Sequence, residues 1–463
     1  MDLDFPESSS REKDGAASMQ QRSPSMEKNA PVTHIIGAGL AGLAAAVRLA
    51  EQGRQVAVYE AAGQAGGRCR SYFDAGFGAV LDNGNHLLLS GNASAIRYLT
   101  LVGGADKLRG PSRAEFDFAD LKTGERWTLK INEGRWPSWL FDRGRRVPAT
   151  KPLDYLAAAP LMWAGRRRTV TDIIAGEGPL YERLWQPLML AALNTDPHEG
   201  SARLAGAIMR NTLAKGGAAC RPLIAEGLSA AFIEPALAYL GKHHGTISFG
   251  KRLREIEFAS GRVRSLKFND GEIAIREGEA IILAVPPWVA QTLVPGLRVP
   301  TEFRAILNAH YSVAPPPQFP PILGLIHGTV EWIFSFPGRL SITISGADRL
   351  IDRPREELAA DLWRDVAAVT GLPAELPPWQ IVKEKRATFA ASPDQDVLRP
   401  EPTTGWRNLF LAGDWVQTGL PATIEGAIRS GERAARLAMR EEATMTEMSE
   451  RAVREDDTFA FAD

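Results

Sequence analysis

One segment near the N-terminus constrains the fold of this chain more than any other part of its sequence. A short apolar run, Val32–Ile36, is typical of a buried parallel strand. Three glycines follow in the spacing G-x-G-x-x-G, and the apolar stretch 40–49 predicts a helix that stops at Gly53. A second strand, Gln55–Tyr59, leads to Glu60. This order of strand, glycine turn, helix, strand and acid predicts an α/β unit that binds a dinucleotide.

The three glycines have separate physical roles in such a unit. Gly37 permits the tight turn, Gly39 lets a pyrophosphate approach the backbone, and Gly42 lets the helix pack closely against the strand. The helix N-terminus offers N–H groups and a positive dipole end to that phosphate. Glu60 is placed to accept hydrogen bonds from a ribose diol, which favours NAD or FAD over NADP. A glycine-rich turn in another α/β protein is the alternative. The cofactor-binding residues predicted here are Gly37, Gly39, Leu40, Ala41, Gly42 and Glu60.

Two later stretches narrow the identity of the dinucleotide. A double glycine and an arginine follow the second strand: Gly66, Gly67 and Arg68. Far downstream, the apolar strand Leu409–Leu411 is followed by Gly413, Asp414 and a helix. Together with the first motif, these residues resemble the FAD-containing amine oxidase and phytoene desaturase superfamily. Taken alone, Gly413 and Asp414 also fit a simple Asx turn.

That resemblance implies a fold and a binding mode. The fold is α/β, with a Rossmann-like FAD-binding domain of the glutathione-reductase type and an interleaved α+β substrate domain. Arg68 is expected near the FAD phosphates, and the backbone around Leu253 is expected at the adenine. The late helix, from Thr423, is expected to point its N-terminus at the flavin, where reduced flavin carries negative charge. The cofactor-binding residues that the resemblance adds are Gly66, Gly67, Arg68, Leu253, Gly413, Asp414, Thr423 and Ile424.

A narrower resemblance rests on the middle and the end of the chain. The strings LWQPLMLAALNTDPHEGSARLAG, from residue 184, and TGLPATIEGAIRSG, from residue 418, are similar to those of the hydroxysqualene dehydroxylase family. This family implies reductive removal of the hydroxyl of hydroxysqualene in squalene and hopanoid synthesis, which gives squalene, water and oxidised FAD. The alternatives are a carotenoid or phytoene-type desaturase, an amine oxidase, or a non-catalytic FAD-bearing scaffold that hands lipid between proteins.

The group that protonates the leaving oxygen is not identified by any motif. Asp82 and His86 fall in a segment that passes near the flavin in the superfamily, so they are our candidate catalytic residues. The alternative is that Asp82 and Asn83 shape a turn and that His86 is a satisfied polar residue. Glu425, at the start of the late helix, is interpreted as a helix-terminus residue rather than as an acid.

The domain organisation that the resemblance implies is discontinuous. The FAD-binding domain is expected to comprise 31–100, 225–295 and 400–445, and the substrate domain 101–224 and 296–399. The ends of the chain, 1–30 and 446–463, are polar with almost no apolar run, which predicts a disordered leader and a disordered tail.

Composition excludes some partners. The chain has 54 Lys and Arg against 55 Asp and Glu, a net charge of −1, which argues against a dedicated nucleic-acid binder. Two cysteines and the lack of any run of about 18 apolar residues predict a cytoplasmic protein with no spanning helix. The seven histidines have no ligand spacing, so no metal site is predicted. Because there is only one G-x-G-x-x-G unit, we expect an external electron donor to reduce the FAD.

Residues 142–169 raise the question of membrane contact. The apolar stretch 153–163 is flanked by basic clusters, and the whole segment has seven basic and two acidic residues. This pattern suits peripheral contact with the inner face of the cell membrane, where a lipophilic isoprenoid substrate dissolves. A core helix with snorkelling arginines is the alternative.

Overall fold

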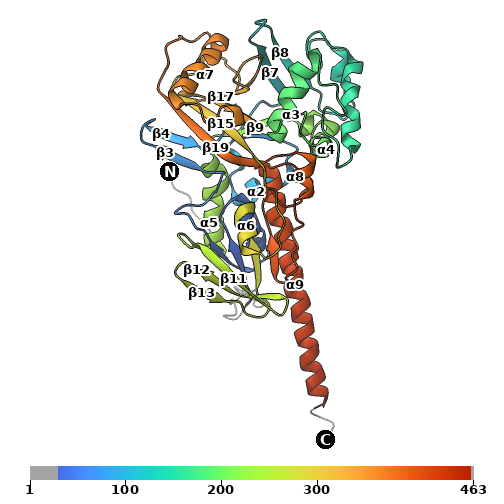
Figure 1. Cartoon of the computed structure of the whole chain (residues 1–463), viewed down its shortest axis with the longest axis vertical. Coiled ribbons are helices and arrows are strands. Elements are labelled where there is room, and N and C mark those ends of the chain that lie inside the picture. Colours follow the sequence, from blue (N-terminus) through green and yellow to red (C-terminus); the bar gives the residue numbers. More distant parts are fainter. Residues whose placement is uncertain (1–29, 460–463) are drawn as a thin grey trace, which may run out of the picture. The chain divides into compact units, whose positions relative to one another are not determined.

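The computed structural model describes residues 30–459, with side-chain surroundings for 30–443. The predicted disordered leader lies outside these residues, except for Ala30. From Pro31 onward the described chain forms a single compact unit that contains two large sheets (Figure 1). Each sheet brings together strands that are distant in the sequence.

The first sheet is parallel and contains both strands of the glycine motif. In spatial order its five strands are β10 (Thr246–Ser248), β2 (Gln55–Tyr59), β1 (Val32–Ile36), β14 (Ala280–Leu283) and β20 (Leu409–Leu411). In the register of the sheet, His34 of β1 lies between Ala57 of β2 and Ile281 of β14. Parallel neighbours require long crossover connections, which explains why this sheet collects strands from three parts of the chain. The predicted α/β fold class is confirmed.

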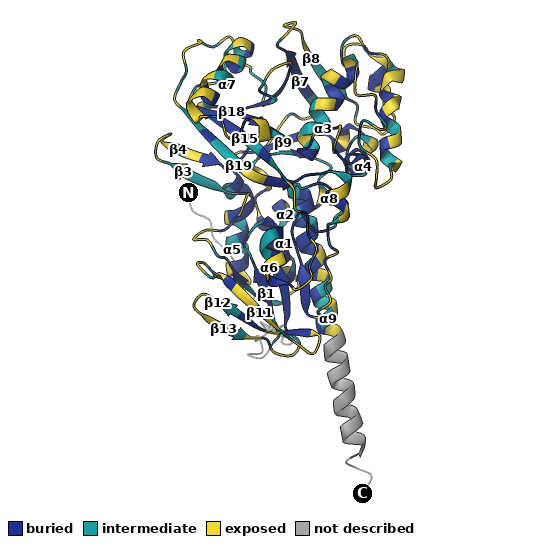
Figure 2. Ribbon diagram, viewed as in Figure 1, coloured by how far each residue is buried: buried dark blue, intermediate teal, exposed yellow. Residues whose placement is uncertain are grey.

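Both faces of the parallel sheet are buried, which is why its strands read as continuous apolar runs. The face that includes Ile35 packs against two helices, α1 (Leu40–Glu51) and α9 (Ile424–Phe459). The face that includes Ile36 packs against a small antiparallel sheet formed by β11 (Leu253–Ala259), β12 (Arg262–Phe268) and β13 (Gly271–Ala274). Figure 2 shows β1 and α1 as buried elements at the centre of these layers. This burial fixes the position of the glycine turn between β1 and α1.

The second sheet has seven strands and a cavity on one side. In spatial order the strands are β19 (Trp379–Phe389), β15 (Phe303–Tyr311), β18 (Arg339–Ile344), β17 (Trp332–Phe336), β16 (Ile322–Ile326), β7 (Ala114–Asp120) and β8 (Arg126–Ile131). Leu307 and Ile342 face α7 (Arg355–Thr370) in one apolar cluster. Their neighbours Asn308 and Thr343 point to the opposite face, because side chains alternate along a strand, and they line the cavity.

Shorter elements join the two sheets. A three-stranded sheet pairs β5 (Leu87–Leu89) with β9 (Pro222–Ala225) and β9 with β6 (Leu108–Arg109). The other elements used below are β3 (Ser71–Asp74), β4 (Ala79–Asp82), α2 (Ala93–Val102), α3 (Gln186–Leu193), α4 (Ala202–Asn211), α5 (Glu234–Lys242), α6 (Pro287–Leu293) and α8 (Pro393–Val397). All strands of the parallel sheet lie within 31–100, 225–295 and 400–445. The discontinuous domain boundaries stay a prediction.

The C-terminal helix differs from the sequence prediction. A disordered tail is predicted over 446–463, whereas α9 continues to Phe459. Residues 446–459 contain neither Gly nor Pro, and half of them, three Glu, two Arg, one Ala and one Met, are residues of high helix propensity. Low hydrophobicity therefore did not exclude a helix over these residues. Residues 460–463 lie outside the described part of the chain.

Candidate active site

A cavity of about 990 Å³ connects the glycine turn with the seven-stranded sheet. We call its two parts the nucleotide end and the apolar end. The nucleotide end is lined by Gly37, Gly39, Leu40, Ala41, Glu60, Gly66, Gly67, Arg68, Leu253, Gly413, Asp414, Thr423 and Ile424. The apolar end is lined by Phe116, Phe118, Leu129, Leu184, Leu188, Met189, Ile208, Met209, Trp332 and Phe334. Every cofactor-binding residue predicted from the sequence lines the nucleotide end except Gly42.

Gly42 acts through packing, as the sequence analysis expects. A Cβ added at Gly42 would lie 1.9 Å from the carbonyl oxygen of Gly37, so only glycine lets α1 approach the turn this closely. Gly37 itself has φ +106°, and a Cβ there would lie 2.5 Å from the oxygen of Ala284. Gly39 differs from both, because a Cβ at Gly39 would meet no atom within 4 Å. The open space at Gly39 is on the cavity side of the turn.

The N-terminus of α1 is suited to an anion. Gly39 is its N-cap, no side chain caps the helix, and no acidic residue lies in its first turn. The first-turn N–H groups therefore lack intrahelical partners and carry the positive end of the helix dipole. Leu40 and Ala41, which follow the N-cap, line the cavity.

Glu60 has a role that the sequence analysis missed. One carboxylate oxygen accepts a hydrogen bond from the N–H of Ala38 at 2.8 Å, and the other accepts from the N–H of Ala62 at 2.8 Å. These bonds hold the glycine turn in place. Each carboxylate oxygen has two lone pairs, so Glu60 retains capacity to accept from a ribose diol.

Arg68 and Asp414 join the two motifs that are farthest apart in the sequence. The Nη2 group of Arg68 donates to Oδ1 of Asp414 at 2.7 Å, and its Nη1 group donates to the carbonyl of Ala387. The N–H of Gly413 donates to Oγ of Ser430 in α9 at 3.0 Å, which fixes the turn after β20. The charges of Arg68 and Asp414 therefore offset each other at the cavity wall.

A buried arginine that no motif indicated supports this loop. The side chain of Arg399 is inaccessible to solvent, and its guanidinium donates to the carbonyls of Asp414, Val416 and Leu420 at 3.1, 2.7 and 2.7 Å. It also pairs with Oδ1 of Asp396 at 3.2 Å. One side chain thus satisfies three carbonyls of the turn between β20 and α9. An arginine in the string VLRP has no sequence signal for this task, because its partners are backbone atoms.

Two residues at the start of α9 make capping interactions. Oγ1 of Thr423 accepts from the N–H of Gly426 at 3.0 Å, as expected of an N-cap. Glu425 instead caps a different helix, because its carboxylate accepts from the N–H groups of Ser94 and Ala95, in the first turn of α2, at 3.2 and 2.9 Å. Glu425 therefore has a helix-terminus role, but at α2 and not at the start of its own helix as the sequence analysis expects.

The two candidate catalytic residues have different surroundings. Asp82 does not line the cavity, and its Oδ1 accepts from Oγ of Ser71 at 2.6 Å and from the N–H of Leu228 at 2.9 Å. Burial raises the pKa of Asp82. This geometry fits the turn-shaping alternative. The position of Asp82 gives no support to its predicted role as a catalytic residue, because its carboxylate is held by backbone and serine donors away from the cavity.

His86 does line the cavity. Among the described residues, no hydrogen bond to its ring is present, so it is not the satisfied polar residue of the alternative interpretation. Burial and, secondly, the nearby Arg68 cation lower the pKa of His86 to about 4. The imidazole is therefore neutral at pH 7 and presents one N–H donor and one nitrogen acceptor.

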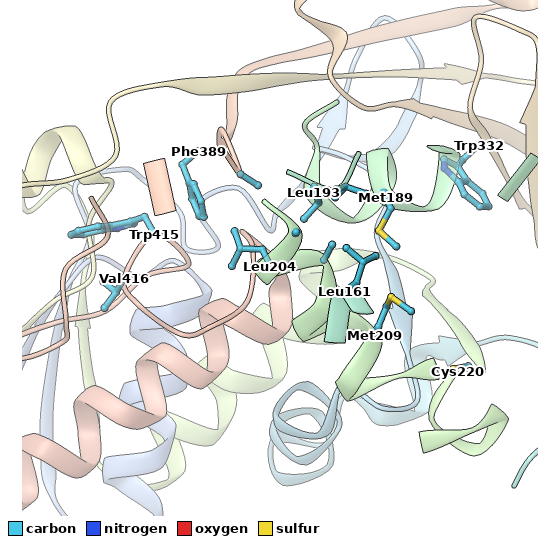
Figure 3. Close-up of a cluster of buried hydrophobic side chains, with 14 of the residues drawn as sticks. Leu161, Met189, Leu193, Leu204, Met209, Cys220, Trp332, Phe389, Trp415 and Val416 are labelled. Atoms are coloured by element: carbon cyan, nitrogen blue, oxygen red, sulfur yellow. The ribbon is translucent and has the colours of Figure 1, made fainter. Parts of the chain in front are cut away.

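The apolar end is assembled from side chains of several elements. Figure 3 shows Met189 and Leu193 of α3 and Met209 of α4 in one apolar cluster that extends to Trp332 of β17. A small polar group interrupts this wall. Nδ2 of Asn85 donates to Oγ1 of Thr343 at 3.1 Å. Among the described residues, no donor reaches the buried Oδ1 of Asn85. The cavity therefore offers a long apolar surface with a few polar atoms, as expected for an apolar ligand with one polar group.

Comparisons with known proteins place this site in a family. Residues 40–439 match the sequence model of the flavin containing amine oxidoreductase family. A hydroxysqualene dehydroxylase of Rhodopseudomonas palustris is 57% identical, with 88% of this chain and 98% of that protein covered. One of Sinorhizobium fredii is 54% identical, with 90% and 99% covered. This chain belongs to the flavin containing amine oxidoreductases and, within them, to the hydroxysqualene dehydroxylase family. It is an FAD-dependent oxidoreductase.

More distant similarities agree with the fold. A probable zeta-carotene desaturase of Synechococcus elongatus is 26% identical, with 87% of this chain and 97% of that protein covered. The solved structure of a cyclohexylamine oxidase from Brevibacterium oxydans superposes with a TM-score of 0.64 at 16% identity, and covers 89% of this chain and 99% of that one. The predicted FAD-binding fold is thereby confirmed.

The nucleotide end fits FAD on observations from this structure. The uncapped N-terminus of α1 and the open space at Gly39 suit a pyrophosphate, and the free lone pairs of Glu60 suit a ribose. Within residues 30–459, no group of three or more His, Cys, Asp or Glu side chains is placed to bind a metal ion. No helix in this part of the chain is long and apolar enough to cross a membrane.

Proposed function

We propose that this chain converts hydroxysqualene to squalene by reductive removal of the hydroxyl group. The observation that carries the proposal is the high identity to hydroxysqualene dehydroxylases over nearly their whole length. Reduced FAD, when bound, supplies a hydride. In the overall reaction the carbon–oxygen bond breaks and the hydride forms a carbon–hydrogen bond at the same carbon. The leaving hydroxyl takes up a proton and is released as water. The products are squalene, water and oxidised FAD.

The apolar end would hold the hydrocarbon part of the substrate. Its lining is contributed by aromatic and aliphatic side chains of α3, α4 and the seven-stranded sheet. Burial of hydrocarbon contributes about 25 cal/mol per Å² of apolar surface removed from water. The same wall excludes water from the reacting carbon, which protects a cationic carbon from side reactions. Binding and water exclusion therefore both depend on this lining.

His86 is the chain's candidate for contact with the leaving oxygen. It lines the cavity, its ring is free of protein hydrogen bonds within the described residues, and its pKa of about 4 keeps it neutral at pH 7. A neutral imidazole donates a hydrogen bond to a hydroxyl oxygen and does not hold a spare proton. We assign to Asp82 a positioning role, because its carboxylate fixes the end of β4 against Leu228.

Electrons are proposed to come from an external donor. The chain has a single G-x-G-x-x-G unit, and it lies at the nucleotide end of the cavity. A second dinucleotide site is therefore not indicated. Anaerobic mixing of the oxidised enzyme with NADPH alone should leave the flavin absorbance unchanged on the timescale of turnover. Fast, stoichiometric bleaching by NADPH would overturn the proposal of an external donor.

Contact with a lipid surface is also part of the proposal, because hydroxysqualene and squalene dissolve in bilayers and not in water. The enzyme would act as a peripheral protein that takes its substrate from the lipid phase.

The experiment that tests the reaction starts from photoreduced enzyme, so that it does not depend on the natural electron donor. Anaerobic photoreduced protein mixed with hydroxysqualene in detergent micelles should form one squalene for each flavin reoxidised. A desaturase would leave hydroxysqualene unchanged and convert a polyene precursor, and an amine oxidase would form peroxide from an amine in air. Either result, without squalene formation, would contradict the proposal.

A further inference from the structure

We propose that one surface of the substrate region, which we call the η2–η3 face, docks on an anionic lipid bilayer. It is formed by two short 3₁₀ helices, η2 (Ser138–Phe141) and η3 (Pro152–Trp163), and the loops beside them. This inference rests on the proposed function in one respect only, namely that the substrate is a lipid. The apolar residues of the η2–η3 face are Trp136, Phe141, Leu153, Leu156 and Trp163, and its exposed cations are Arg143, Lys151, Arg166 and Arg167.

Exposed apolar side chains are concentrated on this face. Nine large apolar side chains of the described residues are exposed, and five of them lie between 136 and 163. Their exposed fractions are 73% for Trp136, 67% for Phe141, 75% for Leu153, 58% for Leu156 and 76% for Trp163. Clustered exposed apolar residues mark an interaction site, whereas isolated ones are normal.

The period of η3 separates a buried row from an exposed row. Residues three apart lie above one another on a 3₁₀ helix. Tyr155, Ala158 and Leu161 form such a row and are buried. Leu153 and Leu156 form another row and face outward. The core-helix alternative therefore holds for one side of this segment only.

The two short helices belong to one surface because their inner sides are packed together. The rings of Trp139 and Tyr155 meet edge to face with their centroids 5.3 Å apart. The hydroxyl of Tyr155 also accepts from the N–H of Val147 at 3.0 Å, which ties the connecting loop to η3. Trp139 and Tyr155 are buried, so the exposed residues beside them project from a fixed base.

The charge on this face selects an anionic partner. Arg143, Lys151, Arg166 and Arg167 are exposed, and no ion pair to any of them is present among the described residues. The two acidic side chains in the segment accept backbone hydrogen bonds, Asp142 from Gly144 at 2.9 Å and Asp154 from Lys151 at 2.7 Å. Free cations around exposed Trp and Leu match the headgroups and acyl boundary of an anionic leaflet.

The η2–η3 face lies close to the substrate cavity, because η3 packs against a helix that lines it. A Cβ added at Gly206 of α4 would lie 1.8 Å from the carbonyl oxygen of Leu161, so the backbones of α4 and η3 touch. Met209, in the same helix, lines the apolar end of the cavity. Figure 3 shows Leu161 of η3 next to Met209. A bilayer at the η2–η3 face would therefore be one helix away from the substrate cavity.

Co-sedimentation with vesicles tests the proposal. FAD-loaded protein should bind vesicles that contain phosphatidylglycerol, and bind pure phosphatidylcholine vesicles at least tenfold more weakly. The variant Arg166→Glu/Arg167→Glu should reduce binding to anionic vesicles at least tenfold, and Leu153→Ser/Trp163→Ser should reduce it by a similar factor. A matched control is Phe73→Ser/Val80→Ser, which removes two apolar residues exposed by 67% and 59% on the β3–β4 hairpin. The control should bind as the wild type does.

Each outcome has a distinct meaning. If the wild type fails to bind vesicles of either composition, or if the η2–η3 variants bind as well as the control, the proposal is overturned. If the η2–η3 variants bind as well as the control, another surface of the protein contacts the bilayer. If the wild type binds a protein partner and no vesicles, the η2–η3 face docks on a protein and not on a bilayer. Turnover of photoreduced enzyme in detergent should be unchanged in the variants, which shows that they are folded. Vesicle binding without turnover would count against the proposed reaction alone, and turnover without vesicle binding against this inference alone.

Discussion

The two ends of the cavity are built by different means. The nucleotide end consists of a glycine turn, a helix N-terminus and a few side chains, such as Glu60 and Arg68, that are fixed by short hydrogen bonds. The apolar end consists of side chains from α3, α4, the turn before α3 and three strands of the seven-stranded sheet, and one polar contact, between Asn85 and Thr343, interrupts its wall. Backbone geometry at the first end leaves little freedom for substitution, whereas a wall of interchangeable apolar side chains tolerates it.

The strongest test of this contrast is Gly39→Val. The added side chain meets no protein atom within 4 Å of its Cβ, so the fold should persist, but it fills the space proposed for the pyrophosphate. We expect FAD affinity to fall by about 1,000-fold or more, or about 4 kcal/mol. Flavin absorbance of the purified protein and titration of the apoprotein with FAD measure this.

Gly63→Val is the matched control, because a Cβ at Gly63 is equally unhindered and the residue does not line the cavity. It should purify yellow. Unchanged FAD affinity of Gly39→Val would show that the backbone at the turn does not make the nucleotide site.

The next largest effect is expected at Arg399. Substitution Arg399→Met leaves three loop carbonyls and Oδ1 of Asp396 without their buried donor, while Arg203 still donates to Oδ2 of Asp396. We expect a loss of about 3 kcal/mol in the free energy of unfolding and weaker FAD binding. Denaturant unfolding and FAD titration measure the two effects. Arg364→Met, at an exposed pair with Asp361, should cost less than about 0.5 kcal/mol. A similar small cost at both positions would mean that Arg399 does not support the loop.

A buried histidine of the seven-stranded sheet contributes a pH dependence of stability. His310 of β15 is buried, and burial followed by the Arg339 cation lowers its pKa from 6.5 to about 3. In the unfolded chain the imidazole takes up a proton as the pH falls below 6.5, whereas in the folded chain it stays neutral. Stability is therefore complete above pH 6.5 and is lost as the pH falls.

Between pH 7.5 and 5.5 the loss from His310 should be about 1.4 kcal/mol. The measurement is the free energy of unfolding at both pH values for the wild type and for His310→Gln, whose pH-dependent loss should be smaller by that amount. Identical pH dependence in the two proteins would show that His310 titrates normally in the fold.

The smallest effect is expected for a conservative change at the apolar end. Leu188→Met keeps the volume and the apolar character of a half-buried lining residue. Steady-state turnover of hydroxysqualene should change kcat/KM by less than about threefold, and FAD affinity should not change. A tenfold loss would contradict the contrast, because it would show that the apolar end recognises a specific side-chain shape.

The predictions from the sequence succeeded for features set by consecutive residues and failed for contacts between separate segments. The glycine spacing located β1, α1 and β2, since local backbone requirements are written in consecutive residues. It gave no indication that Glu60 holds the turn or that Arg399 holds the loop after β20, because these contacts join separate segments. Asp82 and His86 are four residues apart, yet only His86 reaches the cavity. The side on which each residue lies depends on how β4 and β5 pack.

The order of residues was sufficient by itself to specify a dinucleotide turn, a FAD-type fold and the basic, apolar character of 142–169. The cavity, the partners of Arg68 and Glu425, and the division of η3 into a buried and an exposed row were decided by the tertiary structure. The physical reason is the range of the interactions. Chain stiffness, glycine conformations and helix dipoles act within a few residues, whereas a cavity wall and an exposed face exist only after distant segments have packed.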